Sequence, residues 1–496
     1  MTKSARRTAI TCRLAAVLLI AMAVAACSPA AEPQGLWGKL WSLEVGPDYR
    51  RPELRPVEEF RSQVGPAEAS SLADLPWWKV FNDKVLQQLI VMGLTQNYDL
   101  QLAADRVEQA HALVGVAAGS LYPQIGYQGL AGREKAFVPL EQSGGNITFN
   151  AFAGLFNVAW EIDVWGRIRR STEAARAALF AQEDIRRGVM LTLVSEIATS
   201  YFSLLELDRE LDIAQESART YKQTLDLFTQ RFEFGKDSKL PVTRAQAAYD
   251  SSIANVASLK RAIAQQENAL SILLGAFPEK IERGIELTQQ TTPSTPLGAI
   301  TDIMQRRPDV LQAEQNMIGA NAQVGVAVAN FFPRIGLSAL YGGQSQNIGD
   351  VVDNSFSIWN IAGNLAGPVF QGGQILESYY AQQAFWEGTI AQYKQTVLIA
   401  FQEVSDSLIA QETLVAQRAA LEDQVVSLQE AVELSLLRYN AGRASYFEVL
   451  EAEQLLFPAQ DALAQTQRDQ LLAVVNLYRA LGGGWDLSDT QWSKPP

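Results

Sequence analysis

The residues of this 496-residue chain that are best placed to do chemistry are two glutamates, Glu448 and Glu451. They lie three positions apart, so a helix places both carboxylates on one face. Such a pair can attract cations, repel anions or form an ion pair with a basic side chain. It can equally belong to a solvated helix face. The choice depends on the elements that hold the pair.

Enzyme chemistry has little support in the sequence. His111 is the only histidine, which leaves no His-based triad and no His-rich metal site. None of the Asp and Glu residues lies beside a nucleophile, a glycine-rich phosphate loop or a cluster of metal ligands. We therefore expect no catalytic residue, no metal and no cofactor, and a carboxylate-only hydrolase is the weakest alternative. The net charge of −13 also argues against nucleic acid as a partner.

A second reactive residue lies near the N-terminus. A basic segment is followed by thirteen apolar residues, Leu14–Ala26, which are too few for a permanent membrane helix. The sequence Val-Ala-Ala-Cys that ends at Cys27 has the form of a bacterial lipobox, in which the cysteine becomes the acylated first residue. Cys12 would leave with the signal peptide, so Cys27 would be the only remaining cysteine. We expect export and a lipid anchor at Cys27 rather than a leftover thiol.

The acidic pair follows a turn that occurs twice in the chain. Equivalent residues recur 207 positions apart (438 − 231), as in the pairs Arg231 and Arg438, Gly235 and Gly442, and Ala245 and Ala452. A shared offset of this kind indicates a tandem duplication. In each copy a glycine allows the chain to reverse between a long helix and a second helix. Arg244 precedes Glu451 by the same offset and holds its position in the first copy.

Each copy is expected to contain a β-hairpin followed by a helical hairpin. Residues 124–163 and 334–370 are rich in glycine and aromatic residues, with stretches of strand-like alternation. Apolar residues then recur with 4-3 spacing over about sixty positions, which indicates coiled-coil helices about 90 Å long. The predicted helical hairpins cover residues 171–274 and 378–481.

These patterns predict six segments. They are a signal peptide (1–26), an acylated extended leader (27–75), a first repeat (76–283), a linker (284–294), a second repeat (295–484) and a C-terminal tail (485–496).

The strands raise the question of how the chain meets a membrane. No segment after residue 26 has eighteen consecutive apolar residues, so no membrane helix is expected. A closed β-barrel is the other structure that satisfies the backbone in lipid. Four predicted strands are too few, because known barrels have at least eight. Identical chains must therefore pool their strands around an axis, and the residues alone allow two copies or three.

Several motifs resemble the TolC family of outer-membrane factors, in its lipoprotein branch of OprM- and NodT-like efflux proteins. In chain order they are the lipobox at Cys27, Val45–Tyr49, Trp77-Trp78, Asp163–Arg167, Arg306–Val310 and the turn from Tyr439 to Gly442. The resemblance extends to about Trp485. It implies a homotrimer in the outer membrane of a Gram-negative bacterium. A twelve-stranded membrane β-barrel would continue into a twelve-helix periplasmic α-barrel, with Arg306–Val310 as a structural helix start.

The resemblance also implies a function and its partners. The chain would be the exit duct of a tripartite efflux system that exports drugs or other small toxic compounds. Its partners would be outer-membrane lipid, a periplasmic adaptor and an inner-membrane pump, with an RND pump favoured over MFS and ABC pumps. A type I secretion duct for peptides or proteins is one alternative. A periplasmic coiled-coil lipoprotein tether is another, although a tether needs no strands.

The same resemblance implies roles for the two turns. In the family, acids on the helix after the second turn ring the narrow end of the tunnel, and Glu448 and Glu451 align with them. The expected gate therefore comprises Glu448, Glu451, Phe447 and Arg244, with an Arg244–Glu451 ion pair between neighbouring helices as a latch. Family members often have Asp at the position of Glu451. The turns expected to contact the adaptor are Phe234, Gly235 and Lys236 in the first copy and Ala441, Gly442 and Arg443 in the second.

Overall fold

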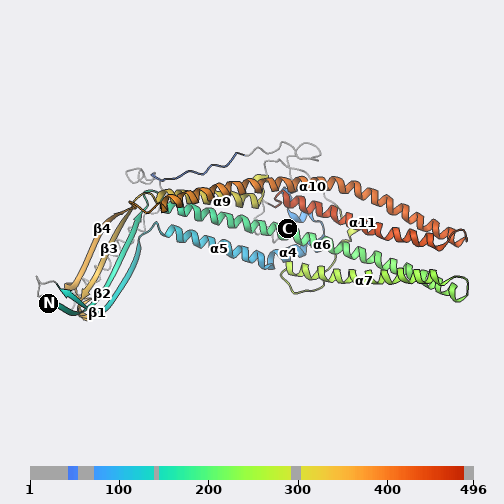
Figure 1. Cartoon of the computed structure of the whole chain (residues 1–496), viewed down its shortest axis with the longest axis horizontal. Coiled ribbons are helices and arrows are strands. Elements are labelled where there is room, and N and C mark those ends of the chain that lie inside the picture. Colours follow the sequence, from blue (N-terminus) through green and yellow to red (C-terminus); the bar gives the residue numbers. More distant parts are fainter. Residues whose placement is uncertain (1–42, 54–71, 139–144, 292–302, 485–496) are drawn as a thin grey trace. The chain divides into compact units, whose positions relative to one another are not determined.

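The computed structural model describes residues 43–53, 72–138, 145–291 and 303–484 (Figure 1). The predicted signal peptide, the predicted lipid site Cys27 and the predicted tail lie outside the described residues. The chain divides into two compact units. The sheet unit contains residues 118–171 and 325–379 together with the segment that ends at Pro47. The helical unit contains residues 48–117, 172–324 and the chain from Tyr380 onward.

The sheet unit holds one four-stranded antiparallel sheet with the strand order β1-β2-β3-β4. The strands are β1 (Gln124–Val138), β2 (Gly145–Ile162), β3 (Arg334–Ser345) and β4 (Ser357–Ala366). Sequence-distant hairpins therefore lie side by side, because β2 pairs with β3, and Figure 1 shows the four strands as one layer. Among the described residues, the outer edges of β1 and β4 have no partner strand.

One row of aromatic side chains crosses the sheet. Tyr127 lies opposite Phe156, Phe156 opposite Tyr341, and Tyr341 opposite Trp359, so each strand contributes one ring. All four side chains are more than half exposed, with exposed fractions of 86%, 62%, 54% and 72%. Aromatic and β-branched residues favour strands because they pack across neighbouring strands. Here they also present an apolar surface that no other described residue of the single chain covers.

The motif Asp163–Arg167 joins β2 to the helix that follows. Gly166 has a φ of +78°, which permits the sharp turn. The Asp163 carboxylate accepts the backbone N–H groups of Ile168 at 3.0 Å and Arg169 at 2.9 Å. The indole N–H of Trp165 donates to the Pro333 carbonyl at 2.8 Å and so fixes this joint to the start of β3. A carboxylate at a helix N-terminus stabilises the unpaired amide groups there.

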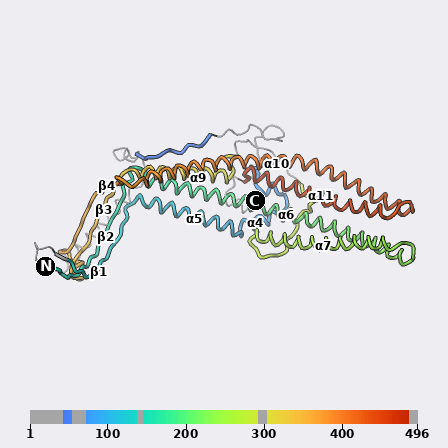
Figure 2. The backbone as a smooth tube through the Cα atoms, in the orientation of Figure 1, coloured from blue at the N-terminus to red at the C-terminus, as the bar shows by residue number. Residues whose placement is uncertain are grey.

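The helices follow the duplication closely (Figure 2). The first copy has α3 (Trp77–Val80), α4 (Lys84–Gln96), α5 (Tyr98–Gly119), α6 (Arg167–Glu233) and α7 (Lys239–Leu273). The second has α8 (Ile303–Arg306), α9 (Pro308–Ala329), α10 (Gln374–Asn440) and α11 (Tyr446–Ala480). Equivalent helices have equal lengths: 22 residues for α5 and α9, 67 for α6 and α10, and 35 for α7 and α11. The expectation of four strands and long helices in two tandem repeats is confirmed.

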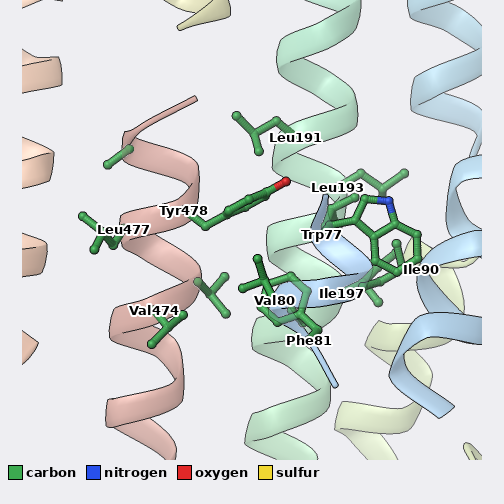
Figure 3. Packing of buried hydrophobic residues seen from close by; sticks show 14 of the residues in the cluster. Trp77, Val80, Phe81, Ile90, Leu191, Leu193, Ile197, Val474, Leu477 and Tyr478 are labelled. Carbon is green, nitrogen blue, oxygen red and sulfur yellow. The ribbon is translucent and has the colours of Figure 1, made fainter. Parts of the chain in front are cut away.

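The main core of the helical unit packs α3, α4, α6 and α11 together. Trp77 and Tyr478 are fully buried, and Figure 3 shows the Tyr478 ring between α11 and α6 and the Trp77 ring beside Ile90. Trp77 also meets Trp78 edge to face, with ring centroids 5.4 Å apart. Burying a tryptophan of this kind stabilises a fold by about 3–5 kcal/mol relative to alanine. The tryptophan pair at the start of the first repeat is therefore a structural motif.

Arg307 connects three helices of the second copy. Its side chain is buried and forms ion pairs with Asp309 at 2.7 Å and with Glu403 of α10 at 2.8 Å. It also donates to the Ala480 carbonyl at the end of α11, at 2.9 Å. One guanidinium thus joins the start of α9 to α10 and α11. A planar guanidinium with five donors suits such a multiple contact.

Helix α6 is long and contains an apolar stretch. Its best 18-residue window has a mean hydropathy of 1.4, which by composition would allow it to cross a membrane. However, 61% of that window is buried inside the protein. The predicted seam residues Val194, Ile197 and Tyr201 are fully buried. We therefore treat α6 as a core helix of the helical unit.

Candidate functional site

The site is built on the two helical turns, which have the same backbone geometry. Gly235 has a φ of +70° and Gly442 a φ of +66°, both in the left-handed region. In the first turn the N–H of Lys236 donates to the Arg231 carbonyl at 2.8 Å, and in the second Arg443 donates to Arg438 at 2.9 Å. This six-to-one hydrogen bond, with glycine before the donor, is the Schellman motif. It explains why glycine stands at both positions.

An apolar cluster lies behind the turns. We call it the tip cluster; its buried members are Tyr221, Leu225, Phe228, Ala245, Tyr446, Val449 and Leu450. The ring of Tyr446 meets Phe228 of α6 at 4.9 Å and Tyr439 of α10 at 5.0 Å, both edge to face. Its hydroxyl is hydrogen-bonded to Thr224. The beginning of α11, which carries the acidic pair, is therefore held by packing against both long helices.

The acidic pair itself lies at the surface of the single chain. The Glu448 side chain is 41% exposed and forms an ion pair with Arg438 of α10 at 3.2 Å. Glu451 is exposed. Arg244 of α7 is the basic residue expected to pair with Glu451. Its guanidinium lies 5.6 Å from the centre of the Phe447 ring. Three of the four expected gate residues thus make specific contacts, and Phe447 and Arg244 contact each other.

The expected latch between Arg244 and Glu451 is not formed within one chain. No ion pair joins these two residues in the part of the chain that the structure describes. Phe447 lies one helical turn before Glu451 on the same face of α11, and its ring takes the position over Arg244. The ion pair that the described chain does form here joins Arg438 of α10 to Glu448 of α11.

The residues expected to contact an adaptor are all exposed. Gly235 and Lys236 are exposed in the first turn, and so are Ala441, Gly442 and Arg443 in the second. The most prominent is Phe234, whose side chain is 76% exposed. The side chain is accessible to a partner, although a single exposed apolar residue does not by itself mark an interaction surface.

Sequence reasoning missed Glu453, the acid next to this site. It is only 3% exposed, and one of its carboxylate oxygens has no hydrogen-bond partner in the described structure. Burial alone raises its pKa to about 7. The signal was present, because Glu453 lies four positions after Val449 and three before Leu456, which are both buried. The 4-3 apolar spacing of α11 therefore places this acid on the buried face.

A second group of acids lies between α6 and α11. Glu206 is 5% exposed and accepts from Arg468 at 2.9 Å. Burial raises the pKa of Glu206 to about 7, although Arg468 partly opposes the shift. The pKa of Asp461 is raised to about 6, again mainly by burial. Both acids therefore keep their protons to a higher pH than a free carboxyl group does.

Comparison with known proteins places this geometry in a family. The model described as "Outer membrane efflux protein" matches residues 89–276 and 299–483. The probable efflux pump outer membrane protein TtgC of Pseudomonas putida is 33% identical over 445 residues, which cover 88% of this chain and 92% of TtgC. The cation efflux system protein CusC of Escherichia coli is 29% identical over 450 residues, covering 90% and 96% of the two chains.

A solved structure has the same fold. The outer-membrane channel OprN superposes with a TM-score of 0.81 at 28% identity, covering 89% of this chain and 99% of OprN. The chain therefore belongs to the outer membrane efflux protein family, as its TolC-family motifs predicted, and it is an outer-membrane efflux channel.

Proposed function

We propose that three copies of this chain form the exit duct of a tripartite efflux system that exports small toxic compounds. The duct would receive its cargo from a periplasmic adaptor and an inner-membrane pump of the RND class. The observation that carries the proposal is the sheet with two unpaired edges.

The edges argue for assembly. An unpaired edge strand is not tolerated in lipid, because its N–H and C=O groups lack partners there. The edges of β1 and β4 can be satisfied only by pairing with β4 and β1 of neighbouring copies. Two copies would give eight strands and three would give twelve, both within the known range of barrels. The family resemblance favours three. The exposed aromatic row would then lie on the lipid-facing side of the barrel.

The helix α10 supports the same conclusion. Its seam residues Leu414, Leu421 and Leu428 are only half-buried. Other apolar side chains on α10 are more exposed, with fractions of 66% for Leu398 and 65% for Leu437. A coiled-coil seam that is half-covered in one chain is expected to pack against a second one. In a trimer, neighbouring copies would provide it.

The turns would form the periplasmic mouth of the duct. Glu448 and Glu451 from three copies would place six carboxylates around one axis, where they attract cations. The contacts Glu448–Arg438 and Arg244–Phe447 would hold the helices in the closed state. Phe234 and the two glycine turns would meet the adaptor.

Cargo class is proposed from the relatives. TtgC is named for an efflux pump, and CusC for a cation efflux system. Two further relatives from Pseudomonas putida, each 33% identical, are named for antibiotic efflux and for toluene efflux. Their greater identity favours organic toxic compounds over metal cations as the cargo of this chain. Among the described residues no group of three His, Cys, Asp or Glu side chains could hold a metal ion.

Native mass spectrometry of the chain purified in mild detergent tests the assembly and the lipid anchor together. We expect a complex of three chains, each beginning at residue 27 and carrying acyl groups there. A stable monomer or dimer would contradict the trimer. An unmodified thiol at Cys27 would contradict the anchor but leave the duct proposal standing.

A further inference from the structure

A hollow of about 430 Å³ lies in the helical unit at some distance in sequence from both turns. It is lined by the beginnings of α5 and α9, by the end of α7 and by residues 184–196 of α6. Four carboxylates line it: Asp99, Asp184, Glu196 and Asp309. Much of the remaining wall is apolar and includes Ile185, Val189 and Leu193. The hollow therefore combines negative charge with an apolar surface.

Asp184 is the unusual member of this group. It is only 8% exposed, and it forms no hydrogen bond or ion pair with any residue that the structure describes. By contrast, Asp309 is paired with Arg307 at 2.7 Å. Burial of a carboxyl group disfavours its charged form. Its pKa is accordingly raised to about 6, mainly by burial, with Arg187 partly opposing the shift.

The chemistry of the hollow selects the class of ligand. Above pH 6 the Asp184 carboxylate is mainly ionised, and the charges that act on it are one cation, Arg187, and two further acids, Glu183 and Glu314. A chelated metal ion does not fit, because no three acids among the described residues lie close enough to hold one. A cationic head group next to Asp184, with an apolar body against Ile185, Val189 and Leu193, would satisfy both parts of the wall through charge attraction and apolar contact. The volume is in the range of sites for small organic ligands.

We propose that this hollow binds an organic cation, with Asp184 as the counter-ion of the ligand. The site lies within the helical unit of one chain. It depends neither on the acidic mouth nor on the identity of the pump, so it can fail or succeed independently of the proposed function.

Ligand binding to the purified full-length chain in detergent tests the proposal. The probe is 4-(trifluoromethyl)benzyltrimethylammonium, observed by ¹⁹F NMR; 4-(trifluoromethyl)benzoate has a similar body with the opposite charge. We expect the cation to bind and the anion not to bind. Asp184→Asn should weaken binding of the cation by about tenfold or more, since a charge-assisted contact is lost. Asp461→Asn is the matched control, because Asp461 is also an acid of raised pKa but does not line the hollow.

The pH dependence provides a second readout. The probe is a quaternary ammonium and does not titrate, so any change reports on the protein. Affinity should fall between about pH 7.5 and about pH 5 as Asp184 becomes protonated, and it should stay nearly constant in Asp184→Asn. The charged groups that act on Asp184 or share its hollow are Glu183, Arg187 and Glu196 on α6, Glu314 and Asp309 on α9, and Asp99 on α5.

A second variant, which fills the hollow with a larger side chain, keeps the test decisive if Asp184→Asn does not fold. Thr192 lines the hollow and is exposed, so Thr192→Trp should occupy the space and leave Asp184 in place. Loss of binding in this variant would support the site. Equal binding of cation and anion, or unchanged cation binding in both Asp184→Asn and Thr192→Trp, would overturn the proposal.

Discussion

Glu448 and Glu453 lie five residues apart on α11 and have opposite surroundings. Glu448 is partly exposed and paired with Arg438, whereas Glu453 is buried with one oxygen unpaired. Their positions relative to the buried stripe of α11 decide the difference, because a helix turns through about 100° per residue. Glu448 is therefore suited to act on ions in the proposed mouth, and Glu453 to respond to pH.

Removing the acidic pair should change ion selectivity. In the proposed trimer, Glu448→Ala with Glu451→Ala removes up to six negative charges from the mouth. These charges act over about 8–10 Å at physiological salt. We expect weaker cation selectivity in planar-bilayer recording, and loss of block by divalent cations added on the periplasmic side.

A control for this variant is Glu216→Ala, which removes an exposed acid of α6 that is paired with Arg219. It should leave selectivity unchanged. If the double variant keeps both the selectivity and the divalent block of the wild type, the acidic pair does not line the conducting path.

Replacing Glu453 should change the pH dependence of stability. The folded pKa of about 7 lies above the ordinary value of 4.5, so folding favours the protonated form. The contribution of Glu453 to the free energy of unfolding is therefore fully present below pH 4.5 and is lost as the pH rises through 7. Glu453→Gln stays neutral, so at about pH 8.5 it should be more stable than the wild type by about 3 kcal/mol.

Thermal unfolding followed by circular dichroism at about pH 5 and about pH 8.5 measures the effect. At the lower pH the variant should gain nothing. An equal gain at both values would show that the carboxyl group does not change its charge in this range.

At the scale of elements, the two turns illustrate how glycine determines a helical hairpin. Both turns need a left-handed residue to reverse the chain, and neither glycine has another atom within 4 Å of an added Cβ. An added side chain there would meet no neighbouring element, so its cost arises within the backbone of the turn itself. It comes from the close approach of Cβ to the following carbonyl oxygen.

Alanine at either turn should therefore destabilise the protein by about 1–2 kcal/mol per site. We expect similar losses for Gly235→Ala and Gly442→Ala in chemical denaturation. Gly388 provides the opposite control, since it lies inside α10 and an added Cβ would meet nothing within 4 Å. Gly388→Ala should stabilise the protein by up to about 1 kcal/mol. Loss of stability in all three variants would contradict the assignment to backbone conformation.

The long helices and the β-hairpins could be predicted from the sequence because each of them occurs in both tandem repeats. The offset of 207 residues fixed α6 against α10 and α7 against α11, and alternation located the hairpins. Partner choice could not be predicted in the same way. The position of Phe447 over Arg244 and the burial of Glu453 depend on which faces of separate helices meet. Periodicity places a residue on a face but does not name the neighbouring helix.

At the scale of the whole molecule, the function belongs to no single residue. The chain has the fold of outer-membrane channels, yet a sheet of four strands cannot enclose a pore. The open edges of β1 and β4 and the exposed apolar side chains of α10 are features that assembly would cover. The pore is therefore expected to be a property of the trimer.

Single-channel recording tests this account most directly. Trimers of the purified wild-type chain, added to a planar lipid bilayer, should produce discrete conductance steps that favour cations over anions. Monomers separated from the same preparation should produce none. Conductance by monomers, or trimers that insert without conducting, would contradict the account.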